Sequence, residues 1–365
     1  MNIDFANLQL QYQKYKLDID TKIHSILNKS NYIMGEEIVE LEKAFESFTG
    51  TKYAITCSSG TDALLLAMMA LDIKPGDEII TSPFTFISSA ETIAFQGARP
   101  VFVDIEPDTF NINADLIEAA ITKNTKAIMP VSLFGQPADF DTIQKIAKKH
   151  NLKVIVDGAQ SFGSFYNDKT DSNWGDISCT SFFPAKPLGC YGDGGAVFTN
   201  NEAYAEKIKM MRIHGQNKRY HHKYIGIGGR LDTIQAAVLL AKLPFYKKEL
   251  EERNKVAQIY SNSLSDFLKT PVIKSGRLSA WAQYTIRVNN RDKIQALLKA
   301  EGIPTAVYYP MSLHLQECFR YLNYQEGDFI ASEKASKEVM SIPMNSFLTS
   351  HEINYVTSSI QKIVN

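Results

Sequence analysis

The chain has 365 residues, 44% of them hydrophobic, and its 39 basic and 40 acidic side chains leave a formal net charge of −1. This composition supplies a sizeable core and excludes intrinsic disorder as the main state, while the balanced charge argues against a strongly basic nucleic-acid surface. The four cysteines lack CxxC spacing, so neither a disulfide framework nor a zinc site is indicated. No apolar run suits a signal peptide or a membrane span, and we expect a cytoplasmic globular protein.

The first half of the chain predicts helices followed by alternating strands and helices. Leu41, Phe45 and Phe48 form an apolar stripe before Gly50, which is typical of a helix. Beyond them, we expect strands at residues 53–56, 78–81, 100–104, 127–131 and 154–156, and helices at 63–71, 88–95, 114–121 and 140–150. Repeated strand–helix–strand units predict a mainly parallel sheet that is covered by helices on both faces.

The second half predicts a smaller unit after the sheet. Two further strands are expected at residues 180–183 and 196–199, and helical patterns dominate from 202 to 268. A strand at 284–288 and helices at 292–301, 332–340 and 351–363 follow. We therefore predict an α/β protein with a large domain at 1–245 and a small C-terminal α+β domain at 246–365.

Three candidate site elements lie at the ends of predicted strands, where open α/β sheets bind ligands. Gly60 and Thr61 precede a predicted helix, so they form either a phosphate cradle or an ordinary helix cap. Asp157 closes a buried strand and either pairs with a cationic ligand nitrogen or caps a loop. Lys186 lies in an apolar loop stiffened by Pro184 and Pro187, where partial desolvation would make its amine nucleophilic.

Together these elements match what pyridoxal phosphate requires. Lys186 would form the Schiff base, the helix N-terminus would hold the phosphate, and Asp157 would keep the pyridine nitrogen protonated. Phe86 follows a strand and is a candidate for stacking on the ring. A dehydrogenase with a nucleotide on the same cradle is the alternative, although the chain lacks the glycine fingerprint of a nicotinamide enzyme.

Several motifs along nearly the whole chain resemble the DegT/StrS family of pyridoxal-phosphate sugar aminotransferases. The matching stretches are Ser59-Gly60-Thr61-Asp62-Ala63-Leu64, Pro75-Gly76-Asp77-Glu78, Asp157-Gly158-Ala159-Gln160, Ser181-Phe182-Phe183-Pro184-Ala185-Lys186, Gly192-Asp193-Gly194-Gly195-Ala196 and Arg230-Leu231-Asp232-Thr233-Ile234-Gln235-Ala236-Ala237. This resemblance implies the aspartate-aminotransferase fold and a homodimer with shared active sites.

The resemblance also implies roles for individual residues. Lys186 would be the cofactor lysine, with Asp157 at the pyridine nitrogen and Gln160 beside the 3-oxygen of the ring. The remaining cofactor contacts would come from Gly60, Thr61 and Ser181 at the phosphate and from Phe86 on the ring face. Retention of Lys186 argues against the sugar dehydratases of the family, which carry histidine at this position.

The run Pro187-Leu188-Gly189-Cys190-Tyr191-Gly192-Asp193-Gly194-Gly195 resembles family members that aminate a 3-keto sugar. The implied substrate is UDP-2-acetamido-2-deoxy-3-oxo-glucuronate of bacterial surface-polysaccharide (lipopolysaccharide O-antigen) pathways, with L-glutamate as amino donor. A uronate and a diphosphate need basic or hydrogen-bonding partners. We expect Arg230, Tyr309 and His314 to supply them, although Tyr309 and His314 could equally serve packing.

Two other functions stay open at this point. One is the same chemistry on another nucleotide-linked keto sugar, such as a dTDP-3-keto-6-deoxyhexose, and the other is a non-catalytic regulatory protein that binds pyridoxal phosphate. The adjacent His221 and His222 have no acidic or thiol partner at suitable spacing, so we expect no metal site.

The family usually carries Gly-x-Asn-x-Arg before the Gln-Ala-Ala helix, and its Asn reaches the cofactor phosphate of the neighbouring subunit. This chain has Gly228 at that position, which cannot make the contact with a side chain. We therefore predict that a Gly228→Asn variant binds pyridoxal phosphate more tightly than the natural chain, as measured by titration of the cofactor-free proteins. Equal dissociation constants would mean that a backbone N–H or a water already replaces the side chain.

Overall fold

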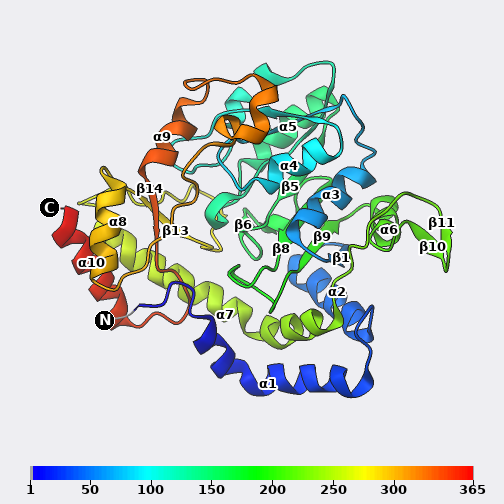
Figure 1. The fold of residues 1–365 in the computed structure, drawn as a ribbon, viewed down its shortest axis with the longest axis horizontal. Coiled ribbons are helices and arrows are strands. Elements are labelled where there is room, and N and C mark those ends of the chain that lie inside the picture. Colours follow the sequence, from blue (N-terminus) through cyan, green and yellow to red (C-terminus); the bar gives the residue numbers. More distant parts are fainter. Residues whose placement is uncertain (1–2, 365) are drawn as a thin grey trace.

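The computed structural model describes residues 3–364 and is built around a seven-stranded sheet (Figure 1). The strand order is β1-β9-β8-β5-β4-β2-β3, and four of the six neighbouring pairs are parallel. β9 is the exception, because it runs antiparallel to both β1 and β8. The strands are β1 (Tyr53–Cys57), β2 (Glu78–Thr81), β3 (Arg99–Phe102), β4 (Thr125–Ile128), β5 (Lys153–Asp157), β8 (Ile177–Ser181) and β9 (Gly195–Thr199).

Helices cover both faces of this sheet, as predicted. Alternate strand residues face opposite sides: Ile55 packs with α3 and α6, whereas Ala54 packs with α2 and α7. The helices on the first face are α3 (Gly60–Ala70), α4 (Ser88–Phe95) and α6 (Glu202–Met211), and those on the second are α2 (Glu36–Thr49), α5 (Phe140–His150) and the first half of α7 (Thr233–Leu264).

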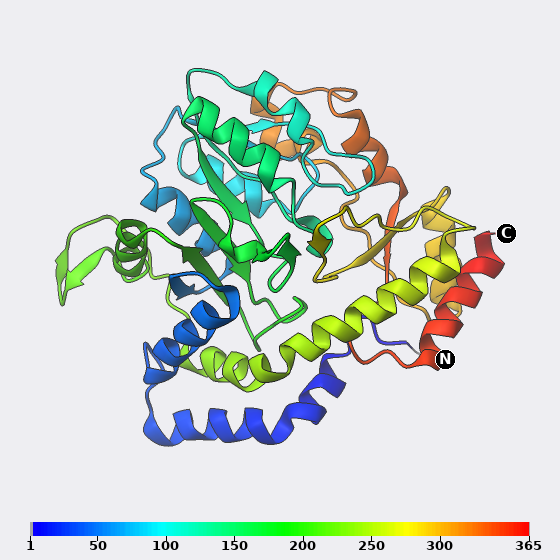
Figure 2. The same ribbon diagram turned by 180° about the vertical axis from the view of Figure 1, so that it is seen from behind.

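A smaller unit packs on the second half of α7. Its antiparallel pair is β13 (Tyr284–Arg287) and β14 (Val339–Ile342), and its helices are α8 (Arg291–Ala300), α9 (Ile330–Glu338) and α10 (Ser350–Val364). Tyr260, Tyr284 and Ile342 belong to one buried cluster that joins α7 to this pair. In Figure 2, α7 (yellow-green) runs without a break from beneath the sheet to α8 and α10.

The N-terminal helix α1 (Leu8–Lys29) packs along α7. Ile19 is buried against Val238 and Ala241, and the rings of Tyr15 and Phe245 stack with centroids 4.3 Å apart. The predicted domain limit at residue 245 lies inside α7, so both units share one helix, and the division at this residue stays a prediction. No helix among residues 3–364 is long and apolar enough to cross a membrane.

The structure differs from the sequence prediction in several short elements. The predicted helix at 114–121 is two 3₁₀ turns, Ala114–Leu116 and Glu118–Ala120, because Asn113 caps the first turn and the chain then turns extended at Ile121. The expected helical region after residue 202 is interrupted by a projecting hairpin of β10 (Gln216–Lys218) and β11 (His221–His222). Three further short strands, β6 (Phe165–Tyr166), β7 (Lys169–Thr170) and β12 (Arg277–Leu278), form a separate sheet. Strands of two or three residues are too short to show a periodic pattern.

Candidate active site

The ends of β5 and β8 and the start of α3 meet at one cavity of about 480 Å³. β5 ends at Asp157 and its neighbour β8 ends at Ser181, so their carboxyl ends lie at the same edge of the sheet. The cavity is lined by Ser59, Gly60, Thr61, Leu64, Thr85, Phe86, Ser88, Val131, Asp157, Ala159, Gln160, Ser181, Phe183, Ala185, Lys186, Asp193, Gln283, Tyr308 and Tyr309.

The N-terminus of α3 forms a cradle of backbone amides at this cavity. The Ser59 side chain caps the helix by accepting a hydrogen bond of 3.0 Å from the Asp62 amide. The Ala63 amide donates to Ser59 O, which leaves the amides of Gly60 and Thr61 without an acceptor among the described residues. Free amides at a helix N-terminus attract an anion such as a phosphate.

Glycines allow α3 to approach the sheet this closely. A Cβ on Gly60 would lie 2.7 Å from Ser181 Cβ, and a Cβ on Gly195 would lie 2.3 Å from Ser59 O. Either contact is too short to exist without movement of the backbone. The cradle therefore lies directly against the ends of β8 and β9, next to the predicted phosphate ligand Ser181.

Asp157 is buried at the end of β5 and has two hydrogen-bond donors among residues 3–364. Ser89 Oγ donates to one carboxylate oxygen at 2.7 Å, and the Ala159 amide donates to the other at 3.1 Å. Burial raises the pKa of Asp157, and these two hydrogen bonds and the charge of Lys186 oppose that shift. The carboxylate is thus held in a fixed orientation in a site that favours a cationic partner.

Lys186 lies in the loop between β8 and β9 and lines the same cavity. Burial lowers the pKa of its ammonium group to about 8, and the charge of Asp157 opposes that shift. More of the amine is therefore neutral near pH 7 than in an exposed lysine, and a neutral amine is the nucleophilic form.

Gln160, Tyr309 and Phe86 lie around the opening between these groups. The Gln160 Oε1 atom accepts from the Phe134 amide at 2.7 Å, and its Nε2 donates to the Tyr309 hydroxyl at 3.1 Å. The rings of Phe86 and Tyr309 are 6.2 Å apart, and Phe86 is 54% exposed. A flat ring entering the cavity would meet aromatic surface at this point.

Two predicted sugar-binding residues lie outside this cavity. His314 is buried in the turn Leu313–Leu315, where its Nε2 lies 3.1 Å from Glu333 Oε1 and its ring packs on Phe329. Its Nε2 is turned to an internal carboxylate and its Nδ1 has no hydrogen-bond partner among the described residues, so the substrate contact stays a prediction. Arg230 follows Gly229, whose carbonyl accepts from the Ser58 amide at 3.0 Å, yet it does not line the cavity of its own chain.

Sequence reasoning missed several lining residues. Thr85 and Ser88 line the cavity after β2, and the neighbouring Ser89, which does not line it, donates to Asp157 although nothing in the pattern marks it. Gln283 reaches the cavity from the segment before β13, and its Oε1 is buried without a partner among the described residues. These residues come from distant segments, so only the fold shows that they share one site.

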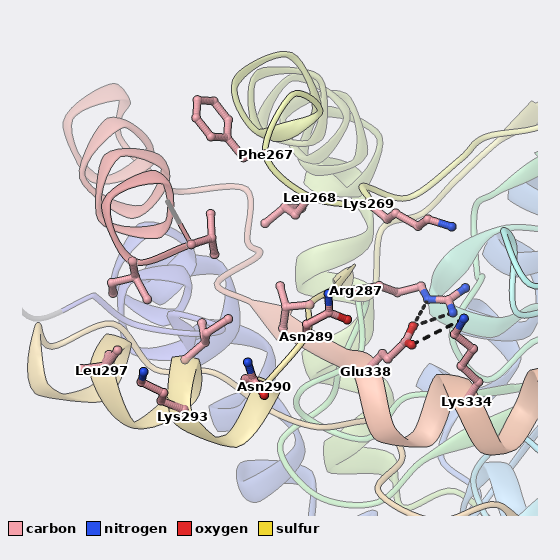
Figure 3. A pocket seen from close by; sticks show the side chains of 14 residues that line it. Phe267, Leu268, Lys269, Arg287, Asn289, Asn290, Lys293, Leu297, Lys334 and Glu338 are labelled. Atoms are coloured by element: carbon pink, nitrogen blue, oxygen red, sulfur yellow. Dashed lines mark hydrogen bonds and ion pairs between the residues drawn. The ribbon is translucent and has the colours of Figure 1, made fainter.

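The residues present fit pyridoxal phosphate. Free amides and close-packed glycines suit the phosphate, the half-satisfied Asp157 carboxylate suits the pyridine nitrogen, and the Lys186 amine suits the aldehyde. A second cavity, of about 470 Å³, lies in the smaller unit and contains none of the predicted site residues (Figure 3). The Arg287 side chain in this cavity is paired with Glu338: its Nε and Nη2 donate to Glu338 Oε2 at 2.9 and 2.6 Å.

Comparison with known proteins gives a family match over residues 14–361, to the DegT/DnrJ/EryC1/StrS aminotransferase family. The chain is 47% identical to UDP-2-acetamido-2-deoxy-3-oxo-D-glucuronate aminotransferase of Pseudomonas aeruginosa, over 98% of this chain and 99% of that protein. It is 43% identical to a protein of Geobacillus stearothermophilus named pleiotropic regulatory protein, over 99% and 98% of the two chains.

Solved structures share the fold over the whole chain. A DegT DnrJ EryC1 StrS aminotransferase from Brucella abortus is 38% identical, with a TM-score of 0.97 and complete coverage of both chains. NtdA from Bacillus subtilis, determined with the bound cofactor PMP, is 29% identical, with a TM-score of 0.93 over 100% of this chain and 85% of that one. The fold is that of pyridoxal-phosphate-dependent aminotransferases, as the sequence predicted.

Gly60→Ala should weaken cofactor binding about tenfold or more, because the added methyl group must push α3 away from Ser181 and tilt the amide cradle. Tenfold in affinity corresponds to about 1.4 kcal/mol. Titration of the cofactor-free variant with pyridoxal phosphate measures the effect, and thermal unfolding of the same protein without cofactor shows whether the fold survives. Unchanged affinity in a folded variant would contradict the assignment of the cradle.

Asp157→Asn should lower the pKa of Lys186 below its value of about 8, because the negative charge that stabilises the ammonium form is removed while burial still favours the neutral form. The pH midpoint for capture of pyridoxal phosphate by the cofactor-free protein should then move to lower pH. The capture rate across pH 6–10, followed by visible absorbance, measures this shift. A midpoint that stays in place or rises would show that the two groups are not coupled.

Proposed function

The chain belongs to the DegT/DnrJ/EryC1/StrS aminotransferase family, and we propose that it transfers an amino group from L-glutamate to the C3 keto group of UDP-2-acetamido-2-deoxy-3-oxo-glucuronate. The observation that carries the reaction type is the joint placement of Lys186, Asp157 and the α3 cradle on one cavity. The 47% identical relative, matched almost end to end, supports the substrate. A cytoplasmic role in the synthesis of surface polysaccharide agrees with a nucleotide-linked substrate.

When bound, pyridoxal phosphate supplies an aldehyde that bonds covalently to amines and a ring that takes up electrons from an adjacent carbon. In this mechanism the α3 amides with Thr61 and Ser181 hold the phosphate, and Asp157 holds a proton on the ring nitrogen. Lys186 would bind the aldehyde and be released by the incoming amino group of glutamate. Its freed Nζ would then move the proton from the glutamate α-carbon to the cofactor, and in the second half-reaction it would move a proton from the cofactor to C3 of the sugar.

The charges of the cavity support a shared active site. Lys186 is the only cationic side chain among the lining residues of the described chain, and it is committed to the cofactor. A sugar diphosphate with a uronate group needs additional cations. We therefore propose a homodimer in which Arg230 of the partner subunit reaches the sugar site, while Tyr309 contacts the sugar from the same chain.

Two alternatives are separated by experiment. A dTDP-3-keto-6-deoxyhexose would use the same reacting groups but has no carboxylate to bind, so competition between this sugar and the uronate tests the substrate. A regulatory protein without turnover is the other alternative, and it is kept because the 43% identical relative is named pleiotropic regulatory protein. Such a protein could hold the cofactor but would not exchange its amino group.

We predict that the cofactor-loaded protein loses its visible absorption band on addition of L-glutamate alone, because the cofactor is converted to its amino form. Addition of the 3-keto uronate should restore the band, and the 6-deoxy sugar should restore it more slowly. Lys186→Ala, which removes the reacting amine, should remain folded and show neither change.

The outcomes distinguish the alternatives. A band that glutamate leaves unchanged would contradict the proposed donor and favour the regulatory alternative. Restoration by the 6-deoxy sugar alone would contradict the proposed substrate but keep the reaction type. Exchange at the natural rate by Lys186→Ala would contradict the role of the lysine itself.

A further inference from the structure

A backbone hydrogen bond closes the base of the loop that carries Lys186, and the segment after Lys186 packs against the segment before it. The Cys190 amide donates to Phe182 O at 2.8 Å, which joins the two ends of the loop. A Cβ on Gly189 would lie 2.4 Å from Pro184 O, so the limb after Lys186 lies directly against the limb before it. A displacement of Gly189 would therefore move both limbs and the lysine between them.

Helix α7 holds the second limb from outside. Lys242 Nζ donates to Gly189 O at 2.5 Å, and Gln235 accepts from the Tyr191 amide at 2.8 Å and donates to Tyr191 O at 3.3 Å. Gln235 and Lys242 are seven residues apart, so they lie two turns apart on one face of α7. These two side chains hydrogen-bond the backbone of Gly189 and Tyr191, near the end of the loop that carries Lys186.

The burial of Lys242 demands an explanation. Its residue is 2% exposed, and burial lowers the pKa of its ammonium group to about 8. Lys242 forms no salt bridge with a carboxylate among the described residues, and the charge of Glu249, which favours its ammonium form, is opposed by that of Arg253. The ammonium is also 5.4 Å from the centre of the Tyr191 ring. An apolar side chain of similar length would pack here without the cost of burying a charge.

We propose that Lys242 is a positioning residue for the cofactor lysine: it anchors the Gly189 carbonyl to α7 and so fixes the loop that presents Lys186 to the cavity. Gln235 provides the second anchor at Tyr191. The inference rests on the proposed function only in taking Lys186 as the lysine that binds the cofactor. According to this proposal, Lys242 affects the reactivity of the Lys186 amine although it lies outside the cavity.

The test compares two cofactor forms that differ in their need for Lys186. Pyridoxal phosphate would be captured covalently by the Lys186 amine, whereas pyridoxamine phosphate has no aldehyde and would bind through its phosphate and ring contacts, without a bond to Lys186. In Lys242→Met, the rate of covalent capture should fall roughly ten- to a hundredfold, as expected for a misplaced reacting group. The dissociation constant of pyridoxamine phosphate should stay within about twofold of the natural value.

The matched control is Lys247→Met, which removes an exposed lysine five residues further along α7 and should change neither quantity. Lys242→Gln keeps a hydrogen-bond donor on a side chain one atom shorter, so it should recover part of the capture rate. It also serves as the test variant if Lys242→Met does not fold, and in that case a further Gln235→Ala variant should slow capture without weakening pyridoxamine phosphate binding.

Each result decides the question. Slow capture with unchanged pyridoxamine phosphate affinity supports the positioning role, and recovery in Lys242→Gln strengthens it. Unchanged capture in a folded Lys242→Met overturns it. Equal losses of capture and of pyridoxamine phosphate affinity also overturn it, because they indicate general damage to the site. If the natural protein itself captures no pyridoxal phosphate, the proposed function fails instead.

Discussion

The active site depends on the close approach of the α3 N-terminus to the ends of β8 and β9. Gly60 against Ser181, and Gly195 against Ser59, leave no space for a Cβ, so the amide cradle lies directly beside the loop that starts at the end of β8. Lys186 lies five residues after Ser181, within that loop. One packing constraint therefore fixes the distance between an anion site and an amine. Any larger side chain at either glycine would separate the two halves of the site.

The two buried ionisable groups near this contact, Asp157 and Lys186, each stabilise the charged form of the other. Burial raises the pKa of Asp157 and lowers that of Lys186, and each charge partly restores the ionised form of the other. A second buried acid, Asp171, lies beneath the strand end, where Ser132 and Ser161 donate to it and where a Cβ on Gly158 would be 2.7 Å from its Oδ2. Burial raises the pKa of Asp171 to about 7. This support restrains the turn that presents Asp157, so the carboxylate keeps its direction when a cation arrives.

Much of the fold and of the cofactor site follows from the sequence, because buried strands and helices leave periodic patterns and because strand ends locate ligand sites. Gly60, Asp157 and Lys186 each lie at such a position, whereas Gln160 was expected only from the resemblance to the family. The orientation of His314 could not be predicted, because a histidine near a predicted site carries no sign of which way its ring turns, and here its Nε2 faces Glu333. Ser89 and Gln283 could not be predicted, since they reach the site from segments whose position depends on the tertiary fold. Lys242 had no signal at all, because a lysine within a helix is normally exposed.

Helix α7 contacts both the larger unit and the smaller unit, and residues of both units line the same cavity. Its first half binds the lysine loop through Gln235 and Lys242, and in its second half Arg253 donates to Trp281 O at 2.9 Å. The smaller unit contributes Tyr309, whose hydroxyl accepts a hydrogen bond from Gln160 of the larger unit at the cavity. Pro244 lies between these two halves and has no N–H to donate within the helix, yet α7 is one helix from Thr233 to Leu264. The loop of Lys186 and the unit that carries Tyr309 therefore pack on the same helix, although neither residue lies on it.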